Sequence, residues 1–385
     1  MSAHRCFTAA SRAAVLALGL ATTLGTARAE IVIGASFSQT GPASALGIAP
    51  RNTMALFPTE IGGEKVRLVV LDDATDPANA AKNARRLVEE DKADVIIGST
   101  ASPAALAIAE VALASKTVQL ASAPIEMPEG KDSWTFRLPQ SVDLMAAGSV
   151  EHMLRSGVKR LGFLGYSDSY GESWLRDISQ HAKAAGISVV ASERFARTDT
   201  SATAQALKVV ASQPDAVLVV ASGSGALMPQ KALLERGYSG RIYQTFSAIA
   251  PDLIRMGGKD VEGTLGLSGP GGLPEQLPDT HPSKAVAQDF VKLYEARFGA
   301  GSYNQFAANI WGAKLLLDKA IPLALKKARP GTPEFRAALR EALETMGETV
   351  VPQGVLRYAP GNHFGYDARA RFVLQVKGGA WVAVR

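Results

Sequence analysis

The residues of this chain that are capable of catalysis or metal binding are few and lie far apart. Four of the five histidines, His152, His181, His281 and His363, follow the first 29 residues, and no pair has H-x-x-x-H or H-x-H spacing. The sequence also lacks a G-x-S-x-G motif, a P-loop and a G-x-G-x-x-G loop after a predicted strand. We therefore predict neither an enzyme nor a protein that carries a cofactor or a metal.

Two further groups suggest chemistry but have a simpler interpretation. Asp72, Asp73 and Asp76 are conceivable metal ligands, although helix caps and loop hydrogen bonds are the usual roles of such acids. The glycine-rich stretch 222–225 follows a predicted strand but lacks the spacing of a dinucleotide loop. We interpret it as a turn with close backbone approach.

Residues 66–102 indicate how binding residues would be positioned. Val66–Leu71 predicts a strand buried on both faces, and Asp76 with Pro77 predicts the start of a helix. After a second short strand, Gly98–Ser102 opens the next helix. Ligands in parallel sheets bind beyond the carboxyl ends of strands and against helix N-termini. This unit is therefore expected to form half of a binding site.

Strands and helices alternate in two successive sets, which predicts an α/β fold with two doubly wound parallel-sheet lobes. Three long helices and a tail of strands then follow, so the chain should return to the first lobe and afterwards to the second. We expect three hinge segments, at 137–140, 266–272 and 351–354. The predicted division is 30–138 plus 270–352 for lobe 1, and 139–269 plus 353–385 for lobe 2.

The start of the chain predicts its compartment. A weakly basic beginning, the apolar run Ala13–Leu24 and the small-residue site Ala27-Arg28-Ala29 are typical of a cleaved secretory signal peptide covering residues 1–29. We therefore expect a periplasmic protein. The single cysteine, Cys6, precedes the apolar run, so the mature chain should contain no disulfide.

Charge excludes some partners. Three of the 41 basic residues and none of the 36 acidic residues precede Glu30, so the mature chain is close to neutral. This balance gives no reason to expect nucleic acid or an anionic membrane as a partner.

Three segments resemble the type I periplasmic solute-binding proteins of ABC importers, and specifically the branched-chain amino acid-binding family. They are residues 33–47 with Thr40-Gly41-Pro42, residues 71–99 (LDDATDPANAAKNARRLVEEDKADVIIGS) and Tyr166–Gly171. The resemblance implies two lobes, a three-segment hinge and a small-molecule ligand trapped by lobe closure. It also implies ABC permease transmembrane subunits as partners, and we expect a monomer.

The resemblance also implies a set of ligand-binding residues. In the first lobe these fall on Leu46, Thr100, Ala101, Ser102, Ser122, Ala123 and Ile125. The loop with Ser102 would receive a ligand carboxylate, which a hydroxyl and a helix N-terminus favour, although Ser102 is also a plausible helix cap. Tyr170 would enter from the second lobe, where its neighbours favour a loop tip over the core.

Departures from the family pattern bear on the ligand. Amino acid-binding members of the family have an acid that holds the α-ammonium, a Tyr that faces the ligand and a Thr that helps to bind the amino group. At the corresponding positions this chain has Ser247, Gly223 and Ile125. A buried ammonium without an acid costs roughly several kcal/mol, so these losses argue against an amino acid, unless Glu126 substitutes.

Apolar residues near these positions favour an aromatic ligand. Gly223 would leave room for a ring, and Phe246, Tyr170 and Leu46 would provide apolar walls. Segments 45–48 and 362–367 also resemble the branch that binds benzoate- and phenylpropanoid-type acids. We predict capture of an aromatic or similarly apolar carboxylate; the alternatives are a branched-chain amino acid-binding protein and a ligand-sensing protein on the same fold.

Overall fold

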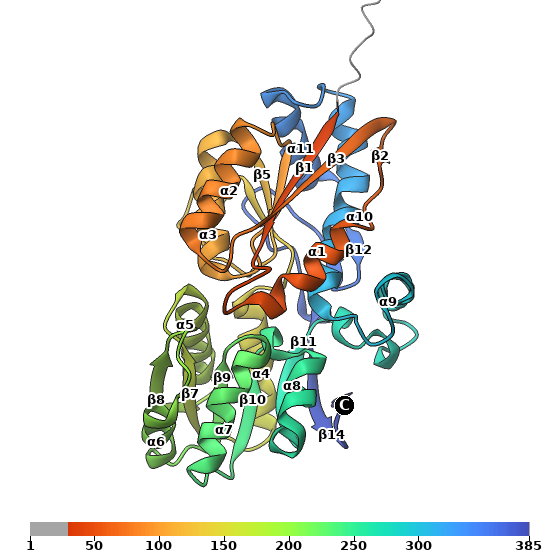
Figure 1. The fold of residues 1–385 in the computed structure, drawn as a ribbon. Helices are drawn as coiled ribbons and strands as arrows, with labels where there is room; N and C mark the ends of the chain where they lie inside the picture. Colours follow the sequence, from red (N-terminus) through yellow and green to blue (C-terminus); the bar gives the residue numbers. More distant parts are fainter. Residues whose placement is uncertain (1–29, 385) are drawn as a thin grey trace, which may run out of the picture.

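Two α/β lobes, stacked one above the other in Figure 1, make up the computed structural model, which describes residues 30–384. The predicted signal peptide lies outside the described residues. Each lobe contains one mainly parallel sheet with helices on both faces. No helix within residues 30–384 is long and apolar enough to cross a membrane.

The lobe 1 sheet has the strand order β2-β3-β1-β4-β5-β6, in which only β2 is antiparallel to its neighbour. Its strands are β1 (Ile31–Phe37), β2 (Glu60–Ile61), β3 (Glu64–Asp72), β4 (Val95–Gly98), β5 (Val118–Ala121) and β6 (Thr135–Arg137). The central strand β1 is buried along its whole length.

Alternate residues of β1 enter two different cores, as the two-residue period of a strand requires. Val32 packs with α2 and α3 on one face, whereas Ile31 and Ile33 pack with α10 and α11 on the other. The helices of this lobe are α1 (Ile48–Met54), α2 (Pro77–Glu89), α3 (Ser102–Ser115), α9 (Lys284–Phe298), α10 (Gln305–Leu325) and α11 (Pro333–Thr345).

The strand predicted at Val66–Leu71 is present within β3, but it is only partly buried. Its outer neighbour β2 has two residues and pairs only with Glu64 and Lys65. Most of β3 therefore forms an edge of the sheet, and the prediction of burial on both faces was wrong. The predicted cap is confirmed, because the Asp76 side chain accepts a hydrogen bond from the backbone N–H of Asn79 at 2.8 Å.

The lobe 2 sheet has the order β15-β14-β11-β10-β9-β7-β8, with β14 and β15 antiparallel to their neighbours. Its strands are β7 (Arg160–Tyr166), β8 (Ser188–Phe195), β9 (Ala216–Val220), β10 (Arg241–Gln244), β11 (Leu265–Ser268), β14 (Phe372–Lys377) and β15 (Ala380–Ala383). Its helices are α4 (Val142–Arg155), α5 (Ser169–Ala184), α6 (Thr203–Ala211), α7 (Leu227–Glu235) and α8 (Pro251–Gly257).

Buried glutamines join the segments at the hinge. The Gln140 side-chain amide donates to the carbonyl of Gln353 at 2.9 Å, and the Gln353 amide donates to that of Gln305 at 3.0 Å. Gly269 lies against the Gln140 side chain, since a Cβ at residue 269 would be 2.3 Å from the Gln140 amide nitrogen. The three predicted hinge segments thus meet in space.

The last crossing into lobe 2 lies later than the predicted residue 353. The hairpin of β12 (Thr349–Val351) and β13 (Gly354–Leu356) is followed by Tyr358, which packs in the lobe 1 core and donates to the Arg137 carbonyl at 2.7 Å. Tyr366 also packs there, and the chain joins the lobe 2 sheet only at β14. The boundary was predicted from loop composition, which does not reveal that an aromatic residue beyond it packs in the lobe 1 core.

Candidate functional site

A small cavity between the lobes contains most of the predicted site residues. Its volume is about 20 Å³, which is room for about one water molecule, so a larger ligand requires the lobes to separate. The lining residues are Leu46, Thr100, Ala101, Ser102, Ser122, Pro124, Pro139, Tyr170, Arg197, Ser222, Phe246, Ser247, Phe306 and Asn309. We call this the ligand cavity.

A buried carboxylate fixes the lobe 1 wall. Asp73 accepts hydrogen bonds from the hydroxyls of Ser36 (3.1 Å), Ser38 (2.8 Å) and Ser99 (2.7 Å) at the ends of β1 and β4. Burial raises the pKa of Asp73, and the three hydroxyls oppose that shift. This network holds the loop that leads into α3, whose first residue is Ser102. The predicted role of these acids in loop hydrogen bonds is confirmed.

The lobe 2 wall includes Tyr170, which lies in the first turn of α5 and is buried. The expectation of a loop tip was wrong, because Asp168 caps the helix by accepting from the backbone N–H groups of Tyr170 and Gly171. The Tyr170 hydroxyl is hydrogen-bonded to Ser247 Oγ at 2.8 Å and to Thr245 Oγ1 at 3.0 Å. Burial raises the pKa of Tyr170 to about 12, so its hydroxyl is neutral at physiological pH.

Arg197 brings a positive charge to the cavity. Its Nε donates to Asp168 Oδ2 at 2.5 Å, an Nη donates to Ser222 Oγ at 3.1 Å, and its guanidinium lies 4.1 Å from the centre of the Tyr166 ring. The sequence analysis missed this residue. It follows β8 by two residues, and the rule that ligands bind beyond strand ends was the signal that could have identified it.

Two buried polar atoms in the lining have no hydrogen-bond partner among the described residues: Ser122 Oγ and Asn309 Oδ1. Asn309 and Phe306 come from the first turns of α10, about 60 residues after Ser247, the last residue of the predicted site. Their i, i+3 spacing on one helix face is a weak signal, which becomes useful only once the helix is placed. Pro124, Pro139 and Ser222 were also missed.

Three predicted residues lie outside this lining. Ala123 packs against Ala105 and Ala109, while Ile125 lines an adjoining groove. Gly223 lies against lobe 1, since a Cβ there would be 2.8 Å from the Ala45 Cβ. The space left by the missing side chain is thus taken by an interlobe contact, and it is not room for a ring as we expected.

Comparison with known proteins identifies the family. Residues 30–380 match a family model described as periplasmic binding protein. The chain belongs to this family. The predicted resemblance and the two-lobe α/β fold are confirmed, and the family is non-enzymatic.

Two solved structures and one curated relative illustrate the similarity of this chain to known proteins. An extracellular ligand-binding receptor from Rhodopseudomonas palustris is 45% identical, with a TM-score of 0.90 over 92% of this chain and 99% of that one. A Leu/Ile/Val-binding protein homolog from Brucella abortus is 27% identical over 89% of this chain and 88% of the relative. An R. palustris solute-binding protein in complex with benzoate shares the fold, at 20% identity and a TM-score of 0.75 over 92% and 95% of the chains.

The ligand cavity offers hydrogen-bond donors suited to a small anion. The ligand cavity combines a cation, hydroxyl groups and the start of α3, and within residues 30–384 no cluster of His, Cys, Asp or Glu is arranged to hold a metal ion. Its lining comes from both lobes, so a solute bound there contacts both.

Proposed function

We propose that this protein captures an aromatic or similarly apolar carboxylate between its lobes and delivers it to an ABC permease. One observation carries the proposal. Among the described residues, the lining of the ligand cavity includes one charged side chain, Arg197, and no carboxylate. Such a lining offers charge-assisted N–H donors to an anion and offers an ammonium no negatively charged partner.

Arg197 is prepared to bind a carboxylate. The ion pair with Asp168 and the ring of Tyr166 hold the guanidinium in place. Its hydrogen bonds to Asp168 and Ser222 use two of five N–H donors, so others can donate to a ligand. Ser102 lies on the facing wall, at the N-terminus of α3, where the helix dipole also favours an anion. A carboxylate that contacts both residues would hold the lobes closed.

The position of the missing acid supports the same ligand class. Ser247 is buried and its hydroxyl is hydrogen-bonded to Tyr170, so it offers an ammonium no negative charge. An unpaired ammonium beside Arg197 would cost roughly several kcal/mol. Buried apolar side chains contribute to the lining from both lobes, with Phe246 on one side and Leu46 and Phe306 on the other.

A ligand panel tests the proposal. The mature protein, stripped of ligand by unfolding and refolding, is titrated calorimetrically with benzoate, 4-hydroxybenzoate, cinnamate, branched-chain oxo-acids, Leu, Ile and Val. We expect binding of one or more of the acids without an amino group and none of the amino acids. The panel includes both classes because the relatives' names mention both Leu/Ile/Val and benzoate.

A matched pair of variants locates the bound carboxylate. Arg197→Met should weaken acid binding at least about tenfold, because charge-assisted hydrogen bonds are worth about 1.5–3 kcal/mol. Arg194→Met removes a nearby arginine that pairs with Glu172 outside the ligand cavity, and it should bind as wild type does. Binding of Leu, Ile or Val by the wild type, or equal effects of the two variants, would contradict the proposal.

A further inference from the structure

Two carboxylates, one from each lobe, share a single guanidinium nitrogen at the boundary between the lobes. Arg176 lies in α5 of lobe 2, and its Nη2 is 2.5 Å from Oε2 of Glu126 in lobe 1. The same nitrogen is 2.7 Å from Oδ1 of Asp177, the next residue of α5, and the Arg176 Nε donates to that oxygen at 2.7 Å. In the closed arrangement the two carboxylates therefore compete for one cation.

Asp177 is poorly compensated when it is ionised in this arrangement. It is 5% exposed, and its second oxygen, Oδ2, is buried without a hydrogen-bond partner among the described residues. Burial of a charged group without full pairing is costly, whereas a protonated carboxyl carries no charge. Burial and, after it, the Glu126 carboxylate raise the pKa of Asp177 to about 6, against the attraction of Arg176.

The elements packed against α5 are α3, α4, β7 and β8. Asp143 of α4 also raises the pKa of Asp177, and it pairs with His181 of α5 at 2.7 Å. His181 is therefore a second titratable group beside Asp177, and an experiment must separate the two. The other charged or titratable groups on these four elements and on the rest of α5 are Glu110, Glu151, His152, Arg155, Arg160, Glu172, Lys183, Glu193 and Arg194.

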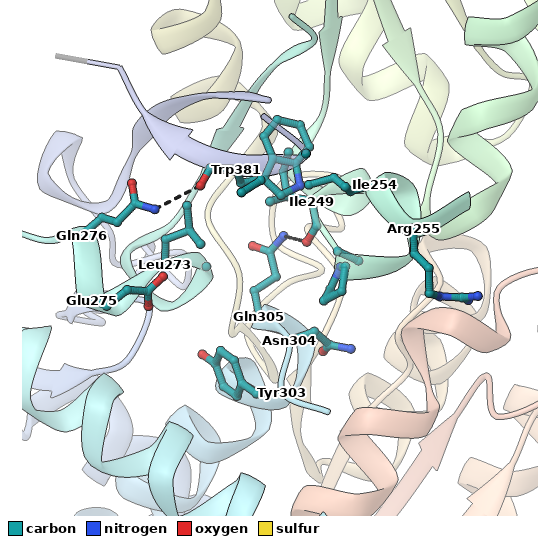
Figure 2. Close-up of a pocket in the computed structure, with 15 residues that line it drawn as sticks. Ile249, Ile254, Arg255, Leu273, Glu275, Gln276, Tyr303, Asn304, Gln305 and Trp381 are labelled. Carbon is teal, nitrogen blue, oxygen red and sulfur yellow. Dashed lines mark hydrogen bonds between the residues drawn. The ribbon is translucent and has the colours of Figure 1, made fainter. Parts of the chain in front are cut away.

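Opening of the lobes separates Glu126 from Arg176, because the hinge holds the opposite side of the interface. Near the hinge, the Gln305 side-chain amide of α10 donates to the carbonyls of Phe246 (2.5 Å) and Ile249 (2.9 Å) in lobe 2, and Figure 2 shows the bond to Ile249. In Figure 1, α3 and α5 lie on the side of the molecule away from α10. The shared guanidinium is thus on the side that opens.

The sign of a coupling between opening and protonation follows from these positions. Opening removes the Glu126 carboxylate from Asp177, whereas Arg176 stays beside it on the same helix. Loss of a nearby negative charge lowers the pKa of a carboxyl group, so the open form binds this proton less tightly than the closed form does. By linkage, closure becomes more favourable as the pH falls through the closed-form value of about 6.

We propose that closure of the two lobes is coupled to protonation of Asp177, and that Glu126 is the lobe 1 group that makes the proton affinity depend on closure. Mildly acidic conditions then favour the closed arrangement that holds a solute, and a rise in pH favours opening and release. The coupling belongs to closure itself and does not rest on the proposed carboxylate ligand.

Energy transfer between dyes on the two lobes tests the coupling without any solute. Residues 30–385 contain no cysteine, so single cysteines can replace the exposed Lys82 of α2 in lobe 1 and the exposed Lys159 before β7 in lobe 2. A glutamate titrates near pH 4.3, so the measurement stays between pH 7.5 and 5.5. We expect the ratio of closed to open protein to rise about twofold to threefold over this range, for a pKa difference of about half to one unit. A ratio independent of pH would overturn the proposal.

Three variants assign the response to its groups. Asp177→Asn cannot ionise, so its closed fraction should stay high and constant. Glu126→Gln changes a partly exposed side chain and removes the lobe 1 carboxylate, so it should flatten the response. His181→Gln removes the second titratable group and should respond as wild type does. A wild-type response in Asp177→Asn or Glu126→Gln, or its loss in His181→Gln, would overturn the proposal.

Discussion

Arg176 of α5 in lobe 2 lies 2.5 Å from a carboxylate oxygen of Glu126 in lobe 1, so an ion pair joins the lobes beside the ligand cavity. It lines a groove of about 370 Å³ that shares Ser102 and Pro124 with that cavity. In Figure 1, α5 faces α3 across the gap between the lobes. Lobe opening must break this pair, so it stabilises the closed arrangement.

Removal of the ion pair should speed release of the bound solute. The Arg176 side chain is 54% exposed, and such pairs contribute about 0.2–1 kcal/mol. Arg176→Met should therefore raise the dissociation rate up to about fivefold, measured by stopped-flow tryptophan fluorescence with the acid that the panel identifies. Lys208→Met breaks a pair with Glu193 within lobe 2 and is the control. Equal rates in wild type and Arg176→Met would contradict a role of this ion pair in holding the lobes closed.

A new carboxylate at Ser247 should reverse the charge preference of the ligand cavity. Ser247 is buried in the lining, so a glutamate there would repel a ligand carboxylate and would pair with an ammonium. We expect Ser247→Glu to lose acid binding at least about tenfold in calorimetric titration. Ser247→Ala loses the hydrogen bond to Tyr170 without adding charge, so it should change affinity far less. Acid binding retained by Ser247→Glu would place this residue outside the contact with the ligand.

Arg197 and Phe306 show what the sequence could not predict. The fold followed from strand and helix periodicity, whereas Thr100, Ser102 and Tyr170 were assigned through the family resemblance, and all three line the ligand cavity. Arg197 also follows a strand, since β8 ends at Phe195, but the family resemblance assigned it no binding role. Phe306 reaches the cavity through tertiary packing of α10, which no local pattern encodes.

Close packing at Gly171 should make this position intolerant of a side chain. A Cβ there would lie 1.7 Å from the carbonyl oxygen of Tyr166, which forces the first turn of α5 to move. We expect Gly171→Ala to lower the free energy of unfolding by about 3 kcal/mol or more and to displace Tyr170 from the ligand cavity. Urea unfolding measures the loss. Ser169→Ala changes the same turn without a clash and should be nearly neutral; similar losses in both variants would contradict the packing argument.

The folded structure destabilises the ionised form of the Asp177 carboxyl group. It is 5% exposed, its Oδ1 lies 2.7 Å from Arg176, and its Oδ2 is buried without a partner among the described residues. Burial, together with the nearby carboxylates of Glu126 and Asp143, raises the pKa of Asp177 to about 6, while Arg176 opposes the shift. The folded protein therefore binds this proton more tightly than the unfolded chain does.

Asp177→Asn should stabilise the protein in a pH-dependent way. Because the pKa is raised, the carboxyl does not lower the free energy of unfolding below about pH 4, where it is protonated in both the folded and the unfolded state. It lowers the free energy of unfolding above about pH 6, where it must ionise in the folded state. A shift of two pKa units corresponds to at most about 3 kcal/mol, and this shift already includes the opposing attraction of Arg176, which keeps its charge in the variant. We expect the stability advantage of Asp177→Asn in urea unfolding to grow from pH 4 to pH 7.5. Asp252→Asn, at an exposed pair with Arg255, should show no such growth, and an advantage independent of pH would refute the assigned cause.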